Sequence, residues 1–359
     1  MLIGFFLSWW LTFFQTLSMP PVPEKPTNII LVIGDGMGLP QIAFNEYLQK
    51  PPSPIARMNV IGLQKTYSTN NLETDSGASA TAISCGVKTF NAAIGLGPDS
   101  MSVPTIMELA KAQGMKTGFV VTSSVVHATP AAFYAHVGSR GSYEEIARQL
   151  TRSGIDVFVG GGEKYFYNRA SDEKNLIQLL KDADYEVIRH IDPPGKFKLE
   201  KVDSEKKIAC FTAFEDPTRA GKGRVYLPGM AVRAKEALEA RSDKGYFLMI
   251  EASQVDWAGH ANDQEWLSFE MQDTYDMLEE LMASIDPEDN TLLIVTADHE
   301  TGYISLKGKR FPRVEFNSKV HSSQMVPVFA SGPGESAFLG IYENTAIFDK
   351  MKELLNLDK

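Results

Sequence analysis

Short apolar runs alternate along this sequence with stretches of helical period, and this alternation most strongly limits the folds open to the chain. The apolar runs are Asn28–Ile33, Thr117–Val121, Val157–Val159, Tyr246–Ile250, Thr291–Val295 and Val326–Ala330. Runs of this length that end in small or polar residues are typical of buried strands. The helical patterns between and after them are Ser102–Gln113, Ser142–Ser153, Glu173–Asp182, Pro228–Arg241, Asp263–Ser284 and Thr345–Leu355. The alternation predicts an α/β fold with a mostly parallel central sheet and helices on both of its faces.

Residues 28–359 are expected to form one domain. Of the 359 residues, 43% are hydrophobic and 22% charged, which is enough apolar material for a large core. The segment 189–224 is charged, contains Pro193 and Pro194, and has weak periodicity. We expect it to be an excursion over the functional site rather than a second domain. In open α/β sheets that site lies at the carboxyl ends of the strands.

The N-terminal residues 1–18 are almost uncharged and strongly apolar. Their length suits the core of a signal peptide better than a membrane span, which needs roughly 20 apolar residues. They lack a basic start and an A-x-A cleavage site, so an uncleaved membrane anchor is the alternative. Residues 19–27 contain four prolines and are expected to form an extended tether. We therefore expect a periplasmic or secreted protein that contacts a membrane only if this segment is retained.

The net charge of −10 limits the possible partners. A surface of this sign repels nucleic acids, so nucleic-acid binding is not expected. It also repels phosphorylated substrates, so a phosphate site would need concentrated positive charge, which metal ions could supply. The two cysteines, Cys85 and Cys210, could form a disulfide, but each lies in an apolar run, which favours two buried thiols.

Two small-residue segments are the first candidates for a site. The first apolar run leads into GDGMG, which has the wrong spacing for a dinucleotide fingerprint and instead suggests a tight turn that presents Asp35. An ordinary aspartate in a glycine turn is the alternative. The segment TDSGASATA predicts a helix with Ser76 at its N-terminus, where free amides and the helix dipole favour an anion. Here the alternative is a simple N-capping pair.

The histidines make a metal site the better interpretation. Asp256 and His260 are four residues apart, so one helical turn presents both. Asp298 and His299 follow the run Thr291–Val295, and His321 lies just before the last run. Together with the aspartate and serine of the two small-residue segments, these residues supply enough nitrogen and oxygen ligands for two zinc ions without any cysteine.

A second group follows the run Thr117–Val121, in the segment HATPAAFYAHVGSR. Arg140 in this segment could clamp phosphate oxygens with two parallel hydrogen bonds. Thr129 and Glu251 offer hard oxygen ligands of the kind that Mg²⁺ prefers. Taken singly, Arg140 could be a surface residue, and we expect His136 to be a packed core histidine.

With these segments in view, the chain resembles alkaline phosphatases from Asn28 to about Gly334. The motifs occur in the order GDGMG, TDSGASATA, HATPAAFYAHVGSR, EASQVDWAGH and TADH, followed by a late histidine before a strand. The resemblance implies a broad-specificity phosphate-monoester hydrolase that acts on small phosphorylated substrates. It also implies two Zn²⁺ ions, one Mg²⁺ ion and a phosphoserine intermediate on Ser76.

The resemblance further implies a role for each matching residue. The first zinc would be held by Asp256, His260 and His321, the second by Asp35, Asp298, His299 and Ser76, and magnesium by Asp35, Thr129 and Glu251. Arg140 matches the phosphate-binding arginine. Some family members have Asp and Lys where this chain has His127 and Trp257, a pair that tunes the magnesium site and reaches phosphate through water. No segment resembles the family's large interface insertion, so a homodimer is left open.

Three rival functions are less consistent with these residues. Related phosphodiesterases typically lack the magnesium ligands and the clamp arginine, whereas Thr129, Glu251 and Arg140 are present here. A sulfatase would need a C/S-x-P-x-R motif, which the residues after Cys85 do not match. A non-catalytic binding protein would usually have lost its nucleophile or a ligand, and none is missing.

Overall fold

The computed structural model describes residues 25–49, 52–167, 169–189, 205–286 and 288–357. The predicted signal peptide or anchor and most of the predicted tether lie outside these residues. Within them, no helix is both long and apolar enough to cross a membrane.

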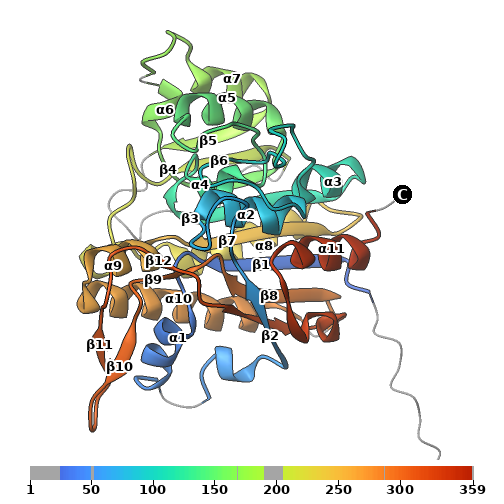
Figure 1. Ribbon diagram of the computed structural model, residues 1–359. Helices are drawn as coiled ribbons and strands as arrows, with labels where there is room; N and C mark the ends of the chain where they lie inside the picture. Colours follow the sequence, from blue (N-terminus) through green and yellow to red (C-terminus); the bar gives the residue numbers. More distant parts are fainter. Residues whose placement is uncertain (1–24, 50–51, 168, 190–204, 287, 358–359) are drawn as a thin grey trace, which may run out of the picture.

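The centre of the molecule is a ten-stranded sheet with the strand order β14-β2-β13-β8-β1-β7-β3-β4-β6-β5 (Figure 1). Its strands are β1 (Asn28–Gly34), β2 (Val60–Lys65), β3 (Lys116–Ser124), β4 (Val157–Gly161), β5 (Tyr185–Arg189), β6 (Lys207–Phe211), β7 (Tyr246–Ala252), β8 (Thr291–Ala297), β13 (Val326–Ser331) and β14 (Gly340–Glu343). Only β13 runs antiparallel to its two neighbours, β8 and β2; the other neighbouring strands pair in parallel. The predicted mostly parallel sheet is therefore confirmed.

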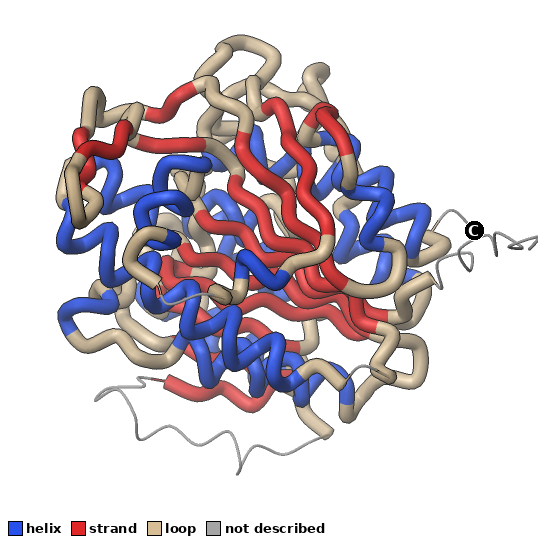
Figure 2. Tube along the Cα trace, turned by 90° about the horizontal axis from the view of Figure 1, so that it is seen from below, coloured by secondary structure: helices blue, strands red, loops and turns tan. Residues whose placement is uncertain are grey.

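Helices cover both faces of this sheet, as Figure 2 shows. They are α1 (Leu39–Glu46), α2 (Ser76–Cys85), α3 (Ile106–Ala112), α4 (Ala128–Ala131), α5 (Tyr143–Ser153), α6 (Lys164–Tyr167), α7 (Leu176–Asp182), α8 (Leu227–Glu239), α9 (Gln254–Ala261), α10 (Gln264–Ser284) and α11 (Thr345–Leu354), with short 3-10 helices η1 (Ile55–Arg57), η3 (Ala220–Lys222) and η4 (Glu335–Phe338). Successive residues of β1 point to opposite faces, because Ile29 and Leu31 join one buried apolar cluster whereas Ile30 and Val32 join the other. Burial of a strand on both faces explains why its sequence is apolar without alternation.

Capping residues set the helix boundaries more sharply than periodicity does. The helix predicted for Ser102–Gln113 begins only at Ile106, because Thr105 and Glu108 form a reciprocal capping box. Asp263 accepts a hydrogen bond from the amide of Trp266 and so caps α10.

The predicted excursion 189–224 is wrong for part of its length. Residues Lys207–Phe211 form β6, which lies inside the central sheet between β4 and β5. The apolar centre of this strand is short and follows two lysines, so its sequence pattern is weak. Cys210 in β6 and Cys85 in α2 are both buried free thiols, as the apolar surroundings predicted. Burial raises the pKa of Cys85 to about 12, so this thiol stays protonated.

Candidate metal and phosphate site

Loops and helix starts at the carboxyl ends of the central strands bring the predicted site residues together. Asp35 follows β1, Glu251 is the penultimate residue of β7, and Asp298 and His299 follow β8 (Figure 1). Asp256 and His260 lie one turn apart on α9, as their spacing predicted. A further two-stranded piece lies nearby: β9 (Glu300–Thr301) pairs with β12 (His321–Ser322), and this pairing carries the late histidine to the site.

One glycine is required for this assembly. Gly36 has a φ of +72°, and a Cβ atom on it would lie 2.8 Å from the Cα atom of Asp256 and from the hydroxyl of Thr301. A larger residue would therefore separate the turn after β1 from α9. The glycine-rich segment is a close-packing turn, which explains its departure from a dinucleotide-binding pattern.

His260 and His321 face each other across Asp256. Their Nε2 atoms are 3.1 Å apart and lie 3.2 Å and 3.5 Å from the two carboxylate oxygens of Asp256. Their Nδ1 atoms contact the backbone carbonyls of Lys319 and Thr74 at 2.5 Å and 2.7 Å. A ring N–H must donate to each carbonyl, which leaves Nε2 as the free nitrogen of each ring. Two nitrogens so close to one carboxylate form a ready set of ligands for a cation.

Ser76 is the first residue of α2 and lies beside a second group. Its Oγ atom is 3.3 Å from Nε2 of His299 and 3.5 Å from Oδ1 of Asp35. Nε2 of His299 is also 3.4 Å from Asp35 and 3.2 Å from Asp298. The nucleophile candidate therefore lies within reach of a buried imidazole and two carboxylates.

Thr301 links these two groups and was not singled out from the sequence. Its hydroxyl donates to Oδ1 of Asp256 at 2.5 Å, so its oxygen can accept the Nδ1–H of His299 at 3.2 Å. This arrangement leaves the Nε2 lone pair of His299 facing Ser76. The dipeptide Asp298-His299 drew attention in the sequence, but a threonine two residues later carries no comparable signal.

A third group lies around the other side of Asp35. Asp35, His127 and Glu251 each offer a ligand atom, and these atoms lie within 4.8 Å of one another, as do those of Asp35, Asp298 and His299 and those of Asp256, His299 and His321. Oδ2 of Asp35, Oε1 of Glu251 and Nδ1 of His127 are buried without a hydrogen-bond partner. Thr129 is also fully buried here, and its hydroxyl is a further buried polar atom without a hydrogen-bond partner. Buried polar atoms without partners are unusual, and this set of oxygen and nitrogen atoms fits a cation.

The electrostatics of the site also favour bound cations. Burial raises the pKa of Asp35 well above its ordinary value, with Asp298 and Asp256 adding to the effect. It raises the pKa of Glu251 to about 7 and that of Asp298 to about 6. Burial would also raise the pKa of Asp256, but the interactions of its carboxylate with the imidazoles of His260, His321 and His299 outweigh burial and lower that pKa. Carboxylates this crowded and buried need positive charge to stay ionised.

Arg140 is held beside His127 by Asp75. One of its terminal nitrogens donates to Oδ2 of Asp75 at 3.0 Å, and the other lies 3.4 Å from Nε2 of His127. Oδ1 of Asp75 accepts hydrogen bonds from the amides of Ala78 and Ala92, so one carboxylate both caps α2 and orients the arginine. The sequence interpretation treated Asp75 only as a cap, because its partner lies 65 residues further along the chain.

His127 and Trp257, the two positions that differ from the Asp/Lys form of the family, are in contact. Their ring centroids are 5.9 Å apart in an edge-to-face arrangement. Burial and Arg140 lower the pKa of His127 to about 3, so this ring is neutral. His136 lies outside the site. It contacts Glu108 of α3 at 3.1 Å and the carbonyl of Gly95 at 2.7 Å, and it is partly exposed rather than fully packed in the core.

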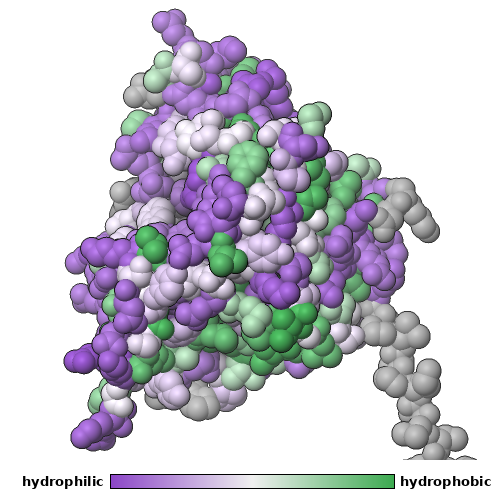
Figure 3. All heavy atoms as spheres, viewed as in Figure 1, coloured by the Kyte–Doolittle hydropathy of each residue, from purple (hydrophilic) through white to green (hydrophobic). Residues whose placement is uncertain are grey.

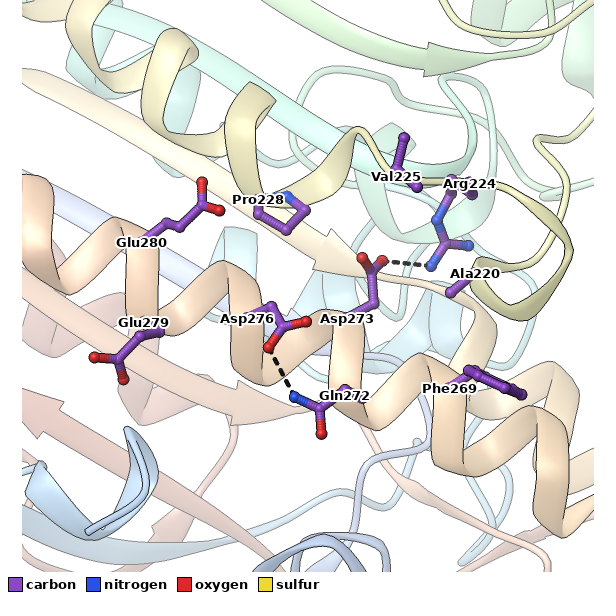
Figure 4. Close-up of a pocket in the computed structure, with 10 residues that line it drawn as sticks. All are labelled: Ala220, Arg224, Val225, Pro228, Phe269, Gln272, Asp273, Asp276, Glu279 and Glu280. Atoms are coloured by element: carbon purple, nitrogen blue, oxygen red, sulfur yellow. Dashed lines mark hydrogen bonds and ion pairs between the residues drawn. The ribbon is translucent and has the colours of Figure 1, made fainter. Parts of the chain in front are cut away.

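A hollow of about 450 Å³ elsewhere on the molecule does not suit a phosphate ester (Figure 4). It lies along α10 near the start of α8, and four of its lining residues are acidic: Asp273, Asp276, Glu279 and Glu280. Its one lining cation, Arg224, is buried in ion pairs with Glu270 and Asp273. An anionic substrate would be repelled there, which leaves the site around Ser76 as the candidate.

Comparison with known proteins supports the same conclusion. A family model for alkaline phosphatase matches residues 26–314. Alkaline phosphatase 3 of Bacillus subtilis is 35% identical over 321 residues, which cover 82% of this chain and 68% of that protein. Alkaline phosphatase 4 of the same organism is 34% identical, but the match spans only 61% of its length.

A solved structure agrees over nearly the whole chain. The alkaline phosphatase of the Antarctic bacterium TAB5 superposes with a TM-score of 0.89 at 39% identity, covering 94% of this chain and all of that one. A histidine-to-glutamate variant of the same enzyme has been solved with Mg bound in its M3 site. The fold, the matched residues and these relatives together show that the chain belongs to the alkaline phosphatase family.

Proposed function

We propose that this chain hydrolyses phosphate monoesters through a phosphoserine intermediate on Ser76. The observation that carries the proposal is the position of the Ser76 hydroxyl, which stands at the start of α2 among the ligand atoms of His299 and Asp35. A serine needs a base or a metal to become a nucleophile, and both kinds of partner can be built from these residues.

The donor sets suit two zinc ions and a third metal. Asp256, His260 and His321 would hold the first zinc, and Asp35, Asp298, His299 and Ser76 the second. Asp35, Thr129 and Glu251 would hold magnesium through oxygen. Bound metals would lower the pKa of the serine hydroxyl and stabilise charge on the leaving oxygen.

The protein's own groups would position the substrate and offset the negative charge of its phosphoryl oxygens. The amides at the start of α2 and the guanidinium of Arg140 offer hydrogen bonds to phosphoryl oxygens. Asp75 keeps that guanidinium in place at 3.0 Å. His299, fixed by Thr301, presents its Nε2 toward the hydroxyl of Ser76. These groups bind the phosphoryl part that all phosphate monoesters share, so we expect broad specificity.

The apolar N-terminal segment supports a periplasmic or secreted location, because segments of this kind act as signal peptides that direct a chain out of the cytoplasm.

A comparison of esters tests the proposed function. With p-nitrophenyl phosphate and its bis-ester as substrates, we expect the monoester to be preferred by at least about 10³-fold, and chelation to abolish both reactions. Arg140→Ala should reduce this preference by about 10- to 100-fold, because the monoester dianion has one more charged oxygen for the guanidinium to bind. Arg148→Ala is the control, because this half-buried arginine is paired with Glu145 on the same helix, α5. A preference for the bis-ester would make the protein a phosphodiesterase and refute the proposal.

The pair His127 and Trp257 should determine how tightly product phosphate is held. Neither side chain carries charge here, whereas an ammonium at 257 would attract phosphate and a carboxylate at 127 would suit magnesium better than imidazole does. The double variant His127→Asp with Trp257→Lys should tighten phosphate inhibition by about 10-fold and bind magnesium more strongly, while turnover slows because release is slower. The phosphate inhibition constant at fixed pH and saturating zinc is the measurement. If it stays unchanged, these two side chains do not act on the phosphate site.

A further inference from the structure

A basic hairpin projects from the body of this acidic protein between two of the ligand-bearing segments. Strands β10 (Ser305–Lys307) and β11 (Arg313–Glu315) pair antiparallel and carry the turn 308–312 at their tip (Figure 1). The hairpin leaves the chain after β9 and returns before β12, the two strands that pair beside the metal ligands. We call residues 305–315 the basic hairpin.

The tip of the basic hairpin concentrates positive charge. Lys307, Lys309, Arg310 and Arg313 are exposed and lie within seven residues, in a chain with 45 acidic and 35 basic side chains. Within the described part of the chain, Lys307 is the one of these four residues that forms an ion pair, with Glu315 of the same hairpin at 2.5 Å. In Figure 3 the projecting tip at the lower left is coloured mainly hydrophilic. The tip is therefore a small cationic surface on a molecule that is otherwise anionic.

Apolar rings are exposed at the same place. Phe311 is 72% exposed and Tyr47, on the neighbouring segment after α1, is 73% exposed. Both line a hollow of about 380 Å³ whose remaining walls are Leu306, Lys307, Gly308, Lys309, Arg310 and Pro312. None of these lining residues is acidic. Exposed aromatic rings that share one hollow with several cations can mark an interaction surface.

The base of the hairpin is rigid, so the tip is held away from the body. Val314 is buried in the core, and its amide donates to Gln264 at the start of α10 at 2.8 Å. Leu306 packs against the same core cluster. A fixed projection lets the cationic tip approach an anionic surface while the acidic body stays back, and at physiological salt the repulsion of that body is screened over about 8 Å.

We propose that the basic hairpin docks the protein on an anionic phospholipid surface. Lysine and arginine side chains near such a surface bind its phosphate groups, and aromatic rings settle at the interface between headgroups and acyl chains. The tip offers both kinds of group within one turn. A nucleic acid would instead contact a longer basic track than the four cations of this tip provide. Docking would keep the site around Ser76 near the membrane surface.

Sedimentation of the full chain with lipid vesicles tests this proposal. Phosphatidylcholine vesicles are compared with vesicles that also contain phosphatidylglycerol, whose diester headgroup is not a monoester substrate. Excess inorganic phosphate is added to occupy the catalytic site. The uncharged N-terminal segment would bind both kinds of vesicle equally, so the gain in binding caused by phosphatidylglycerol reports on the hairpin. This readout is independent of catalysis, so the proposed function can fail without affecting it.

We expect Lys309→Glu with Arg310→Glu to reduce this gain by at least about tenfold. Each basic residue near an anionic surface strengthens binding by up to roughly tenfold, and the double variant removes two of them. Wild-type binding should weaken as salt rises, and Phe311→Ser should weaken it at every salt concentration. The control, Lys174→Glu with Lys181→Glu, makes the same charge change on exposed residues of and near α7 and should bind as wild type. Equal loss in the control would reduce the effect to net charge and refute the proposal. So would unchanged binding of the hairpin variant, or tighter binding of the wild type to soluble heparin or duplex DNA than to vesicles.

Discussion

Replacing Ser76 with alanine is expected to lower kcat by at least about 10³-fold, because it removes the atom that would attack phosphorus and leaves only substrate binding and electrostatic stabilisation. Metal content should change little. The other side chains of the site supply the imidazole and carboxylate ligands, and Ser76 lies at the edge of them, 3.3 Å from His299 and 3.5 Å from Asp35. The measurement is kcat together with zinc content per chain.

Ser84 provides the matched control for this change. It is a buried serine on the same helix, and its hydroxyl donates to the carbonyl of Ala132 at 2.6 Å rather than facing the site. Ser84→Ala should cost about 1 kcal/mol of stability but leave kcat within about twofold. If Ser84→Ala and Ser76→Ala lose activity to the same extent, the effect is structural and Ser76 is not the nucleophile.

Removal of metals is the second change with a large expected effect. Chelation should abolish activity, and it should also lower Tm by at least about 5 °C, because a bound ligand stabilises the folded state and the buried carboxylates would otherwise repel one another. Burial, with mutual repulsion added to it, raises the pKa values of Asp35, Asp298 and Glu251. Zinc together with magnesium should restore more activity than zinc alone, since Asp35 faces two of the ligand groups.

A change at Glu251 tests the proposed magnesium site independently of the two zinc sites. Glu251→Gln should keep the response to zinc and lose the additional response to magnesium, because an amide oxygen is a weaker ligand than a carboxylate. Glu163→Gln is the control: this glutamate is also fully buried, but it contacts Arg189 rather than the site. An undiminished magnesium response in Glu251→Gln would remove Glu251 from the third site.

Much of the fold could be predicted because the central strands are buried on both faces. The six apolar runs correspond to β1, β3, β4, β7, β8 and β13. β6 was missed because lysines precede its short apolar centre. β14 was missed because it is an edge strand whose first residues, Ile341 among them, are exposed, so its sequence lacks the apolar pattern of the central strands. Tertiary pairing decides such strands, and a local pattern cannot reveal it.

The site was more predictable than its supporting contacts. Aspartate, histidine and serine at strand ends attract attention because few other residues supply metal ligands or nucleophiles. Thr301 and the carbonyls of Thr74 and Lys319 fix the histidine rings, but threonine and backbone groups occur everywhere. The link from Asp75 to Arg140 likewise depends on the fold that brings two distant segments together.

The most direct test of the account is to trap the phosphoryl group on the protein. Wild type is mixed with a ³²P-labelled phosphate monoester, quenched in acid, digested and mapped by mass spectrometry. The account predicts label on the peptide that contains Ser76, none in Ser76→Ala, and full labelling in Ser84→Ala. Label on any other residue, or rapid hydrolysis by an enzyme that never becomes labelled, would contradict it.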